Sequence, residues 1–223
     1  MARLKVGVLI SGRGSNLQAL IDAAADPAYP AEIVTVISNR ADAQGLARAA
    51  AAGIPHHVVA ETDRAAFAAA ADKVLKSAGV ELVALAGFMR LLDIGFVEAW
   101  TNRMVNIHPS LLPSFPGLHP QRQALAAGVK FSGCTVHFVR VEVDTGPIIA
   151  QAVVPVKAGD DEDRLAARIL TTEHRLYPLA VRLFAEGRLR IEGDRVAIAG
   201  AIAPDIAVLN PTEVLTGLAS RGH

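Results

Sequence analysis

Short aliphatic runs alternate with alanine-rich stretches through the first half of the chain, and this alternation limits the fold more than any other feature. Continuous aliphatic runs are typical of strands buried on both faces of a parallel sheet. The predicted strands are residues 5–10, 32–37, 57–59, 82–86 and 104–107. The predicted helices between them are residues 17–25, 43–52, 63–77 and 95–100. This order predicts right-handed crossovers and an α/β fold, with an open, mostly parallel, twisted sheet and helices on both faces.

The pattern changes after the fifth strand. Residues 108–120 contain four prolines and two histidines with little periodicity, which indicates an irregular loop. Two strand-like runs at residues 133–139 and 147–156 follow, and they predict antiparallel additions toward the C-terminus.

A long helix is predicted over residues 161–185. We expect Asp160 to cap its start and Gly187 to end it. Residues 189–191 and 196–198 are typical of a small hairpin.

Composition limits the partners. The 22 basic and 22 acidic residues balance, whereas a protein that wraps nucleic acid usually has a basic surplus. Cys134 is the single cysteine, so no intrachain disulfide forms. The apolar run at residues 6–10 is too short for a membrane span. We therefore expect a cytoplasmic protein with small-molecule substrates and with no nucleic-acid or membrane partner.

A glycine-containing loop, Ser-Gly-Arg-Gly-Ser-Asn at residues 11–16, lies between the first strand and the first helix. Its glycines allow close backbone approach, and the helix start offers N–H groups to an anion. A single phosphate fits better than a pyrophosphate, because Leu17 occupies the third-glycine position of a dinucleotide fingerprint. The alternative is a plain turn in which Ser15 or Asn16 caps the helix.

Polar residues also gather at the fifth strand. Asn106 and His108 project to the same side because side chains alternate along a strand, and they lie where open α/β sheets bind ligands. An amide and an imidazole together can stabilise a developing oxyanion. Asp144, beside Thr145 and Gly146, would favour a protonated imidazole if it lies near one. The alternative is a structural role for each residue: Asn106 satisfies a turn at the strand end, His108 is hydrogen-bonded inside the core, and Asp144 is an ordinary turn residue.

We predict no metal site. His56 and His57 point to opposite faces of a strand, and the chain has no His-x-x-x-His or Cys-x-x-Cys pair. His119, His137 and His174 are too scattered to support a site.

Several stretches together resemble the phosphoribosylglycinamide formyltransferase family, the folate-dependent enzymes of purine synthesis. The resemblance covers about residues 4–190, and it implies the formyltransferase fold with a Rossmann-like N-terminal half. The matching stretches are residues 9–19, 86–90, 106–113, 116–119 and 144–147, with weaker agreement from Thr171 to about Gly187.

The resemblance implies a direct formyl transfer from 10-formyltetrahydrofolate to the amine of a phosphorylated glycinamide, with no metal. It implies catalysis by Asn106, His108 and Asp144, in which His108 and Asn106 stabilise the tetrahedral oxyanion. It places the substrate phosphate at Gly14, Ser15 and Asn16, and the sugar at Glu173. The implied folate contacts are Arg64, Met89, Arg90, Leu91, Leu92, Asn106, Arg140, Val141, Glu142, Val143 and Asp144.

For Arg64 and Glu173, ordinary solvated helix charges are the alternative. We expect one domain over residues 1–223. Its parts are a phosphate-binding half (1–105), a folate-binding and catalytic half (106–190), and a C-terminal hairpin and tail (191–223). The sequence leaves open whether the protein forms a homodimer.

Related activities compete with this assignment. Formyltetrahydrofolate deformylase carries an extra N-terminal domain and methionyl-tRNA formyltransferase an extra C-terminal one, and we expect neither here. A sugar-nucleotide formyltransferase and a non-catalytic folate or nucleotide binder are further alternatives. The Asn106, His108 and Asp144 set argues against a binder, which needs no such cluster.

Overall fold

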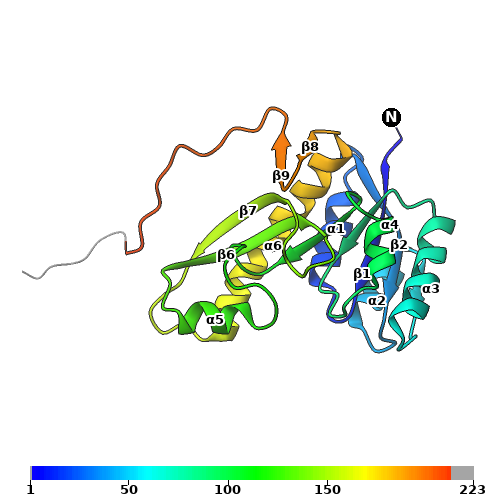
Figure 1. The fold of residues 1–223 in the computed structure, drawn as a ribbon, viewed down its shortest axis with the longest axis horizontal. Helices are drawn as coiled ribbons and strands as arrows, with labels where there is room; N and C mark the ends of the chain where they lie inside the picture. The colour runs from blue at the N-terminus through cyan, green and yellow to red at the C-terminus, as the bar shows by residue number, and fades with distance from the viewer. Residues whose placement is uncertain (1, 212–223) are drawn as a thin grey trace, which may run out of the picture.

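The computed structural model describes residues 2–211. A seven-stranded sheet in the order β3-β2-β1-β4-β5-β6-β7 forms its centre (Figure 1). The first five strands pair in parallel, and β6 and β7 each pair antiparallel to the preceding strand. The strands are β1 Leu4–Ile10, β2 Ala31–Ser38, β3 His56–Val58, β4 Leu82–Leu85, β5 Met104–His108, β6 Phe131–Phe138 and β7 Ile148–Pro155. A separate hairpin pairs β8 Leu189–Glu192 with β9 Arg195–Ile198. The predicted fold class is confirmed.

Helices cover both faces of the sheet. They are α1 Ser15–Ala24, α2 Gln44–Ala51, α3 Arg64–Ser77, α4 Ile94–Ala99, α5 Pro120–Ala126 and α6 Glu162–Ala185. Strand β1 shows why both faces need a cover: Val8 joins the core cluster that contains α1 and α6 residues, while Leu9 joins the cluster that contains α3 and α4 residues. Both side chains are fully buried, as expected for a central parallel strand. No helix in the described part of the chain is long and apolar enough to span a membrane.

Helix α5 and the cap of helix α6 differ from the sequence predictions. Helix α5 was not predicted; Pro120 occupies one of its first two positions, where the missing N–H of proline costs little. Helix α6 is capped by Asp161 rather than by Asp160, so the predicted cap is wrong by one residue. Asp160 instead pairs with Arg168, with Oδ2 2.7 Å from Nη1. That ion pair engages the carboxylate of Asp160 and leaves Asp161 to accept from the Arg164 N–H at 2.8 Å.

Tyr177 of α6 fixes the strands that carry the polar residues. Its side chain is fully buried, and its hydroxyl lies 3.0 Å from the Leu85 carbonyl and 3.2 Å from the Val105 carbonyl. A buried hydroxyl between two strand carbonyls joins α6 to β4 and β5. The ends of these strands are therefore held in place directly beside Asn106 and His108.

Candidate active site

The glycine loop at residues 11–16 has a fixed backbone. Gly14 adopts φ 70°, and a Cβ there would lie 2.5 Å from the Gly45 Cα, so the position requires glycine. The Gly45 N–H donates to the Gly12 carbonyl at 3.0 Å, and Arg48 Nε donates to the Arg13 carbonyl at 2.9 Å. These contacts hold the loop against α2.

The start of α1 presents backbone donors. Gly14 is its N-cap and no side chain caps it, so the alternative in which Ser15 or Asn16 caps the helix is wrong. The Gln18 N–H donates to the Gly14 carbonyl, so the N–H groups of residues 15–17 precede the helical ladder. An anion is the partner that such N–H groups favour.

Asn16 and Glu173 lie in contact although 157 positions separate them. Asn16 Nδ2 donates to Glu173 Oε2 at 2.7 Å, and both residues are buried. Glu173 is therefore not the exposed helix charge of the alternative interpretation. Burial raises the pKa of its carboxyl, and the bond from Asn16 opposes the rise. Within residues 2–211, the buried Asn16 Oδ1 has no hydrogen-bond partner. Buried polar atoms in native proteins normally have a hydrogen-bond partner, so Asn16 Oδ1 is a free acceptor at the start of α1.

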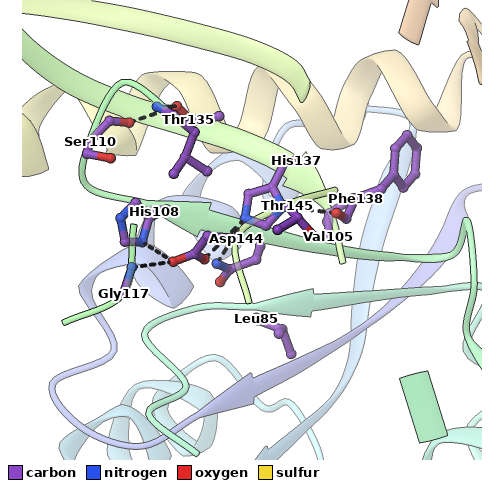
Figure 2. A network of polar contacts seen from close by, with 12 residues as sticks. Leu85, Val105, His108, Ser110, Gly117, Thr135, His137, Phe138, Asp144 and Thr145 are labelled. Atoms are coloured by element: carbon purple, nitrogen blue, oxygen red, sulfur yellow. Dashed lines mark hydrogen bonds and ion pairs between the residues drawn. The ribbon is translucent and has the colours of Figure 1, made fainter. Parts of the chain in front are cut away.

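The structure brings His108 and Asp144 together (Figure 2). His108 Nδ1 lies 3.3 Å from Asp144 Oδ2, and about 7% of each side chain is exposed. The other ring nitrogen, Nε2, lies 3.0 Å from the Phe115 carbonyl oxygen. Both nitrogens of His108 thus face acceptors, and only the doubly protonated ring can donate to both.

Asp144 is held as a carboxylate. It adopts φ 58°, and its Oδ2 accepts from the Gly117 N–H at 2.8 Å. Burial on its own would raise the pKa of this carboxyl. The contacts with His137, with the Gly117 N–H and with His108 outweigh burial and lower the pKa below its usual value. The charged carboxylate lies against the His108 ring and adds a negative charge to the site.

His137 belongs to the same cluster, although no sequence pattern predicts it. It lies opposite Asn106 in the β5–β6 ladder, and its Nε2 is 3.3 Å from Asn106 Nδ2 and 3.7 Å from Asp144 Oδ1. Its Nδ1 lies 2.9 Å from the Phe138 carbonyl, so Nδ1 carries a proton. Nε2 of His137 therefore lies between the Asn106 amide and the Asp144 carboxylate. Figure 2 shows His137 and His108 on either side of Asp144.

The proline-rich loop is anchored beneath His108. Thr135 Oγ1 donates to the Ser110 carbonyl at 2.7 Å and accepts from the Leu112 N–H at 3.0 Å. Ser110 Oγ donates to the Ser114 carbonyl at 2.6 Å. Thr135 lies opposite His108 in the ladder, so β6 supports both this loop and the neighbouring His137–Asn106 contact.

Most of the residues expected to contact folate lie in loops after β4 and β6, the strands on either side of β5; Asn106 lies within β5 and Arg64 begins α3. Met89 and Leu91 are 72% and 52% exposed, and Val141 and Val143 are 44% and 52% exposed. Such exposure of large apolar side chains on neighbouring loops is typical of a ligand-binding surface. Leu92 differs, since it packs partly buried against the core cluster of α3 and α4.

Two of the three arginines in this set, Arg90 and Arg140, donate hydrogen bonds to other protein groups. The Arg90 guanidinium donates to the Glu61 and Thr62 carbonyls and lies 4.9 Å above the Phe67 ring. Arg140 donates to Asn102 Oδ1 at 2.8 Å and to the carbonyl of its own neighbour at 3.0 Å. Arg64 is exposed at the first position of α3, which fits either a folate contact or a solvated charge.

Side chains for a metal site are absent from the described residues: between residues 2 and 211, no group of three histidine, cysteine, aspartate or glutamate residues could hold an ion.

Comparisons with known proteins identify the family of the chain. The Formyl transferase family model matches residues 4–181. Phosphoribosylglycinamide formyltransferase of Escherichia coli K12 is 46% identical over 204 residues, which are 90% of this chain and 96% of that protein. The trifunctional purine biosynthetic protein adenosine-3 of Drosophila pseudoobscura is 56% identical over 84% of this chain. This chain spans only 14% of that protein's length.

Solved structures give the same result. Glycinamide ribonucleotide transformylase 1 of Symbiobacterium toebii has a TM-score of 0.85 and 56% identity, over 88% of this chain and 94% of that one. A formyltetrahydrofolate deformylase of Pseudomonas syringae has a TM-score of 0.82 and 27% identity, over 88% of this chain and 66% of that one. The resemblance seen in the sequence is confirmed, and the chain belongs to the formyl transferase family.

Proposed function

We propose that the chain transfers the formyl group of 10-formyltetrahydrofolate to the amine of phosphoribosylglycinamide, a step of purine synthesis. The observation that carries the proposal is His108, buried between the Asp144 carboxylate and the Phe115 carbonyl and two residues from Asn106 on the same strand. The E. coli relative that is matched over 96% of its length bears the name of this activity.

The amine substrate is bound through its phosphate and sugar. The backbone N–H groups of Gly14, Ser15 and Asn16 face the phosphate in this proposal, because a helix start favours an anion. Glu173 accepts hydrogen bonds from the sugar hydroxyls. The contact between Asn16 and Glu173 supports this, since it places the phosphate and sugar residues side by side.

The formyl donor lies between the segments Met89–Leu92 and Arg140–Asp144, with Arg64 as an outer contact and Asn106 at the reacting end. Exposed Met89, Leu91, Val141 and Val143 would cover the apolar faces of the folate, and backbone groups would bond its edge. The Arg90 and Arg140 side chains are tied to protein groups, so we assign folate contact at these two positions to the backbone.

In the proposed reaction the amine nitrogen attacks the formyl carbon and forms a C–N bond. The carbonyl oxygen gains the electron pair and is stabilised by the His108 imidazolium and the Asn106 amide. The tetrahedral intermediate then collapses, the bond from carbon to the folate nitrogen breaks, and the amine proton passes through water to that nitrogen. His137 holds the Asn106 amide in orientation, which its 3.3 Å contact supports.

The remaining parts of the proposal concern assembly and location. We propose a single domain divided as the sequence analysis predicts, although residues 212–223 of its tail lie outside the described residues. We also propose that the chain works in the cytoplasm without a nucleic-acid partner, which the balanced charge and the single cysteine support. Sedimentation equilibrium measures whether it is a homodimer.

The test is ultraviolet absorbance after the chain is mixed with 10-formyltetrahydrofolate and either phosphoribosylglycinamide or buffer alone. Turnover that requires the amine supports the proposal. Turnover in buffer alone would identify a deformylase, and no turnover with either would identify a binder; both results contradict the proposal.

A further inference from the structure

Ser11 lies where three neighbouring strands end. It follows β1, and its buried hydroxyl donates to Asn39 Oδ1 at 2.7 Å, just after β2. The same hydroxyl accepts from the Met89 N–H at 2.9 Å, four residues after β4. Since β2, β1 and β4 are adjacent in the sheet, one side chain joins the glycine loop to the segment Met89–Leu92.

The direction of both bonds follows from chemistry. A backbone N–H only donates, so Ser11 Oγ is the acceptor toward Met89, and its own hydrogen is free for Asn39. A hydroxyl is the smallest side-chain group that can make both bonds. Alanine at this position would remove both together.

The two loops depend on Ser11 to different degrees. The glycine loop has further ties, from Gly45 to the Gly12 carbonyl and from Arg48 to the Arg13 carbonyl. In the segment from residue 87 to residue 92, the Met89 N–H is the one backbone N–H with a hydrogen-bond partner in the described part of the chain. Loss of the Ser11 hydroxyl therefore removes the backbone hydrogen bond of the second segment and leaves it the Arg90 side-chain bonds and the packing of Leu92, whereas the glycine loop keeps its backbone bonds.

We propose that Ser11 is a positioning residue for the formyl donor, whose hydroxyl fixes the segment Met89–Leu92 at a set separation from the phosphate loop. This inference rests on the proposed function. It assigns Ser11 no contact with either substrate, and its role is to hold the folate side of the site in register with the amine side.

The expected signature is a selective change in the Michaelis constant. A net hydrogen bond contributes about 1 kcal/mol, or about fivefold in affinity, so Ser11→Ala raises the KM for 10-formyltetrahydrofolate by about 5- to 10-fold. The KM for phosphoribosylglycinamide and kcat stay within about twofold of the parent, because the ties of the glycine loop and the Asn106, His108 and Asp144 cluster remain.

Ser38→Ala is the matched control. Ser38 is a fully buried serine at the end of β2, and its hydroxyl also donates and accepts, to the Arg40 carbonyl at 2.8 Å and from the Arg40 N–H at 3.0 Å. Those bonds are local and reach neither ligand segment. Ser38→Ala should lower the melting temperature without a change in either KM.

Further variants separate positioning from general damage. Ser11→Thr keeps the hydroxyl and should restore the folate KM to within about twofold of the parent, since the alcohol makes the same bonds. Asn39→Ala leaves the Met89 bond in place and should raise the folate KM less than Ser11→Ala does. If Ser11→Ala does not fold, Ser11→Cys carries the same test, because a thiol is a weak acceptor of similar size.

A direct binding measurement completes the test. Calorimetry should show weaker binding of tetrahydrofolate to Ser11→Ala by about 5-fold, with unchanged binding of inorganic phosphate. An equal rise of both KM values, a normal folate KM, or the same change in Ser38→Ala would overturn the inference. The parent chain shows by its own turnover whether the proposed function holds, so the two failures are distinguishable.

Discussion

Replacement of Asp144 by asparagine tests the electrostatic part of the proposed mechanism. The substitution keeps the size of the side chain and an oxygen for the Gly117 N–H, but it removes the charge 3.3 Å from His108 Nδ1. At that separation, unit charges attract by about 5 kcal/mol at an effective dielectric constant of about 20. Part of that energy offsets the dehydration of two buried groups.

We therefore expect kcat to fall by about 100- to 1,000-fold, which is the effect of losing an oxyanion stabiliser. Both substrates should still bind, since the substitution leaves the glycine loop and the segment Met89–Leu92 intact and keeps the Gly117 bond that holds the turn at residue 144. The assay is initial rate by absorbance at saturating substrates, together with thermal unfolding to show that the variant folds.

Asp160→Asn is the control for this experiment. Asp160 is also a largely buried aspartate in an ion pair, with Arg168 at 2.7 Å, but it lies before α6 and outside the proposed site. It should change the melting temperature and leave kcat unchanged. A folded Asp144→Asn variant with kcat within about threefold of the parent would refute the electrostatic account, because the structure assigns that charge far more than threefold.

Three further predictions concern titratable groups. The bonds of Arg168 lower the pKa of Asp160 to about 2. Its contribution to the free energy of unfolding should therefore be complete above about pH 4 and vanish as the pH falls toward 2, so Asp160→Asn and the parent should melt alike at the acid end; a melting difference that stays constant with pH would contradict this. Burial raises the pKa of Glu173, so its charge destabilises the fold as the pH rises through and beyond the ordinary carboxyl range. Glu173→Gln should melt higher than the parent at pH 8, should lose that advantage near pH 4, and should raise the KM for phosphoribosylglycinamide; a lower melting temperature at pH 8 would be the opposite result. Burial, and then the charge of Glu173, raise the pKa of the Cys134 thiol to about 12. Iodoacetamide at pH 8 should label it at the rate of unfolding, and rapid labelling of the folded chain would be inconsistent with the structure.

The strands could be predicted because strands buried on both faces consist of continuous apolar residues, which are visible in the local sequence. Residues 5–10 and 104–107 were expected as strands, and they form most of β1 and β5. Both belong to a sheet covered on two faces, where apolar residues must be continuous rather than alternating.

Helix α5 could not be predicted from the local sequence. The prolines at positions 109–120 indicate a loop, and the loop ends in Pro120, which opens the helix rather than breaking it. His119 precedes helix α5 and adopts φ 55°, in the left-handed region. A histidine in the sequence does not indicate this conformation, which tertiary contacts impose.

Some residues of the candidate site could be predicted from the sequence and others could not. Asn106 and His108 follow from side-chain alternation in one strand, whereas the approach of Asp144 depended on the resemblance to a known family. His137 depends on how β5 and β6 pair, and the β6–β7 register shifts at this residue, so spacing in the sequence cannot place it. No pattern in the sequence indicates a role for Ser11, since its bonds to Asn39 and Met89 form only where three strand ends meet.

A crystal structure with phosphoribosylglycinamide and a non-transferring analogue of 10-formyltetrahydrofolate tests the central claim most directly. We expect the phosphate on the N–H groups of Gly14, Ser15 and Asn16, and the formyl oxygen beside the His108 ring and within hydrogen-bond distance of the Asn106 amide. A phosphate bound elsewhere, or a formyl group pointing away from His108, would contradict the account.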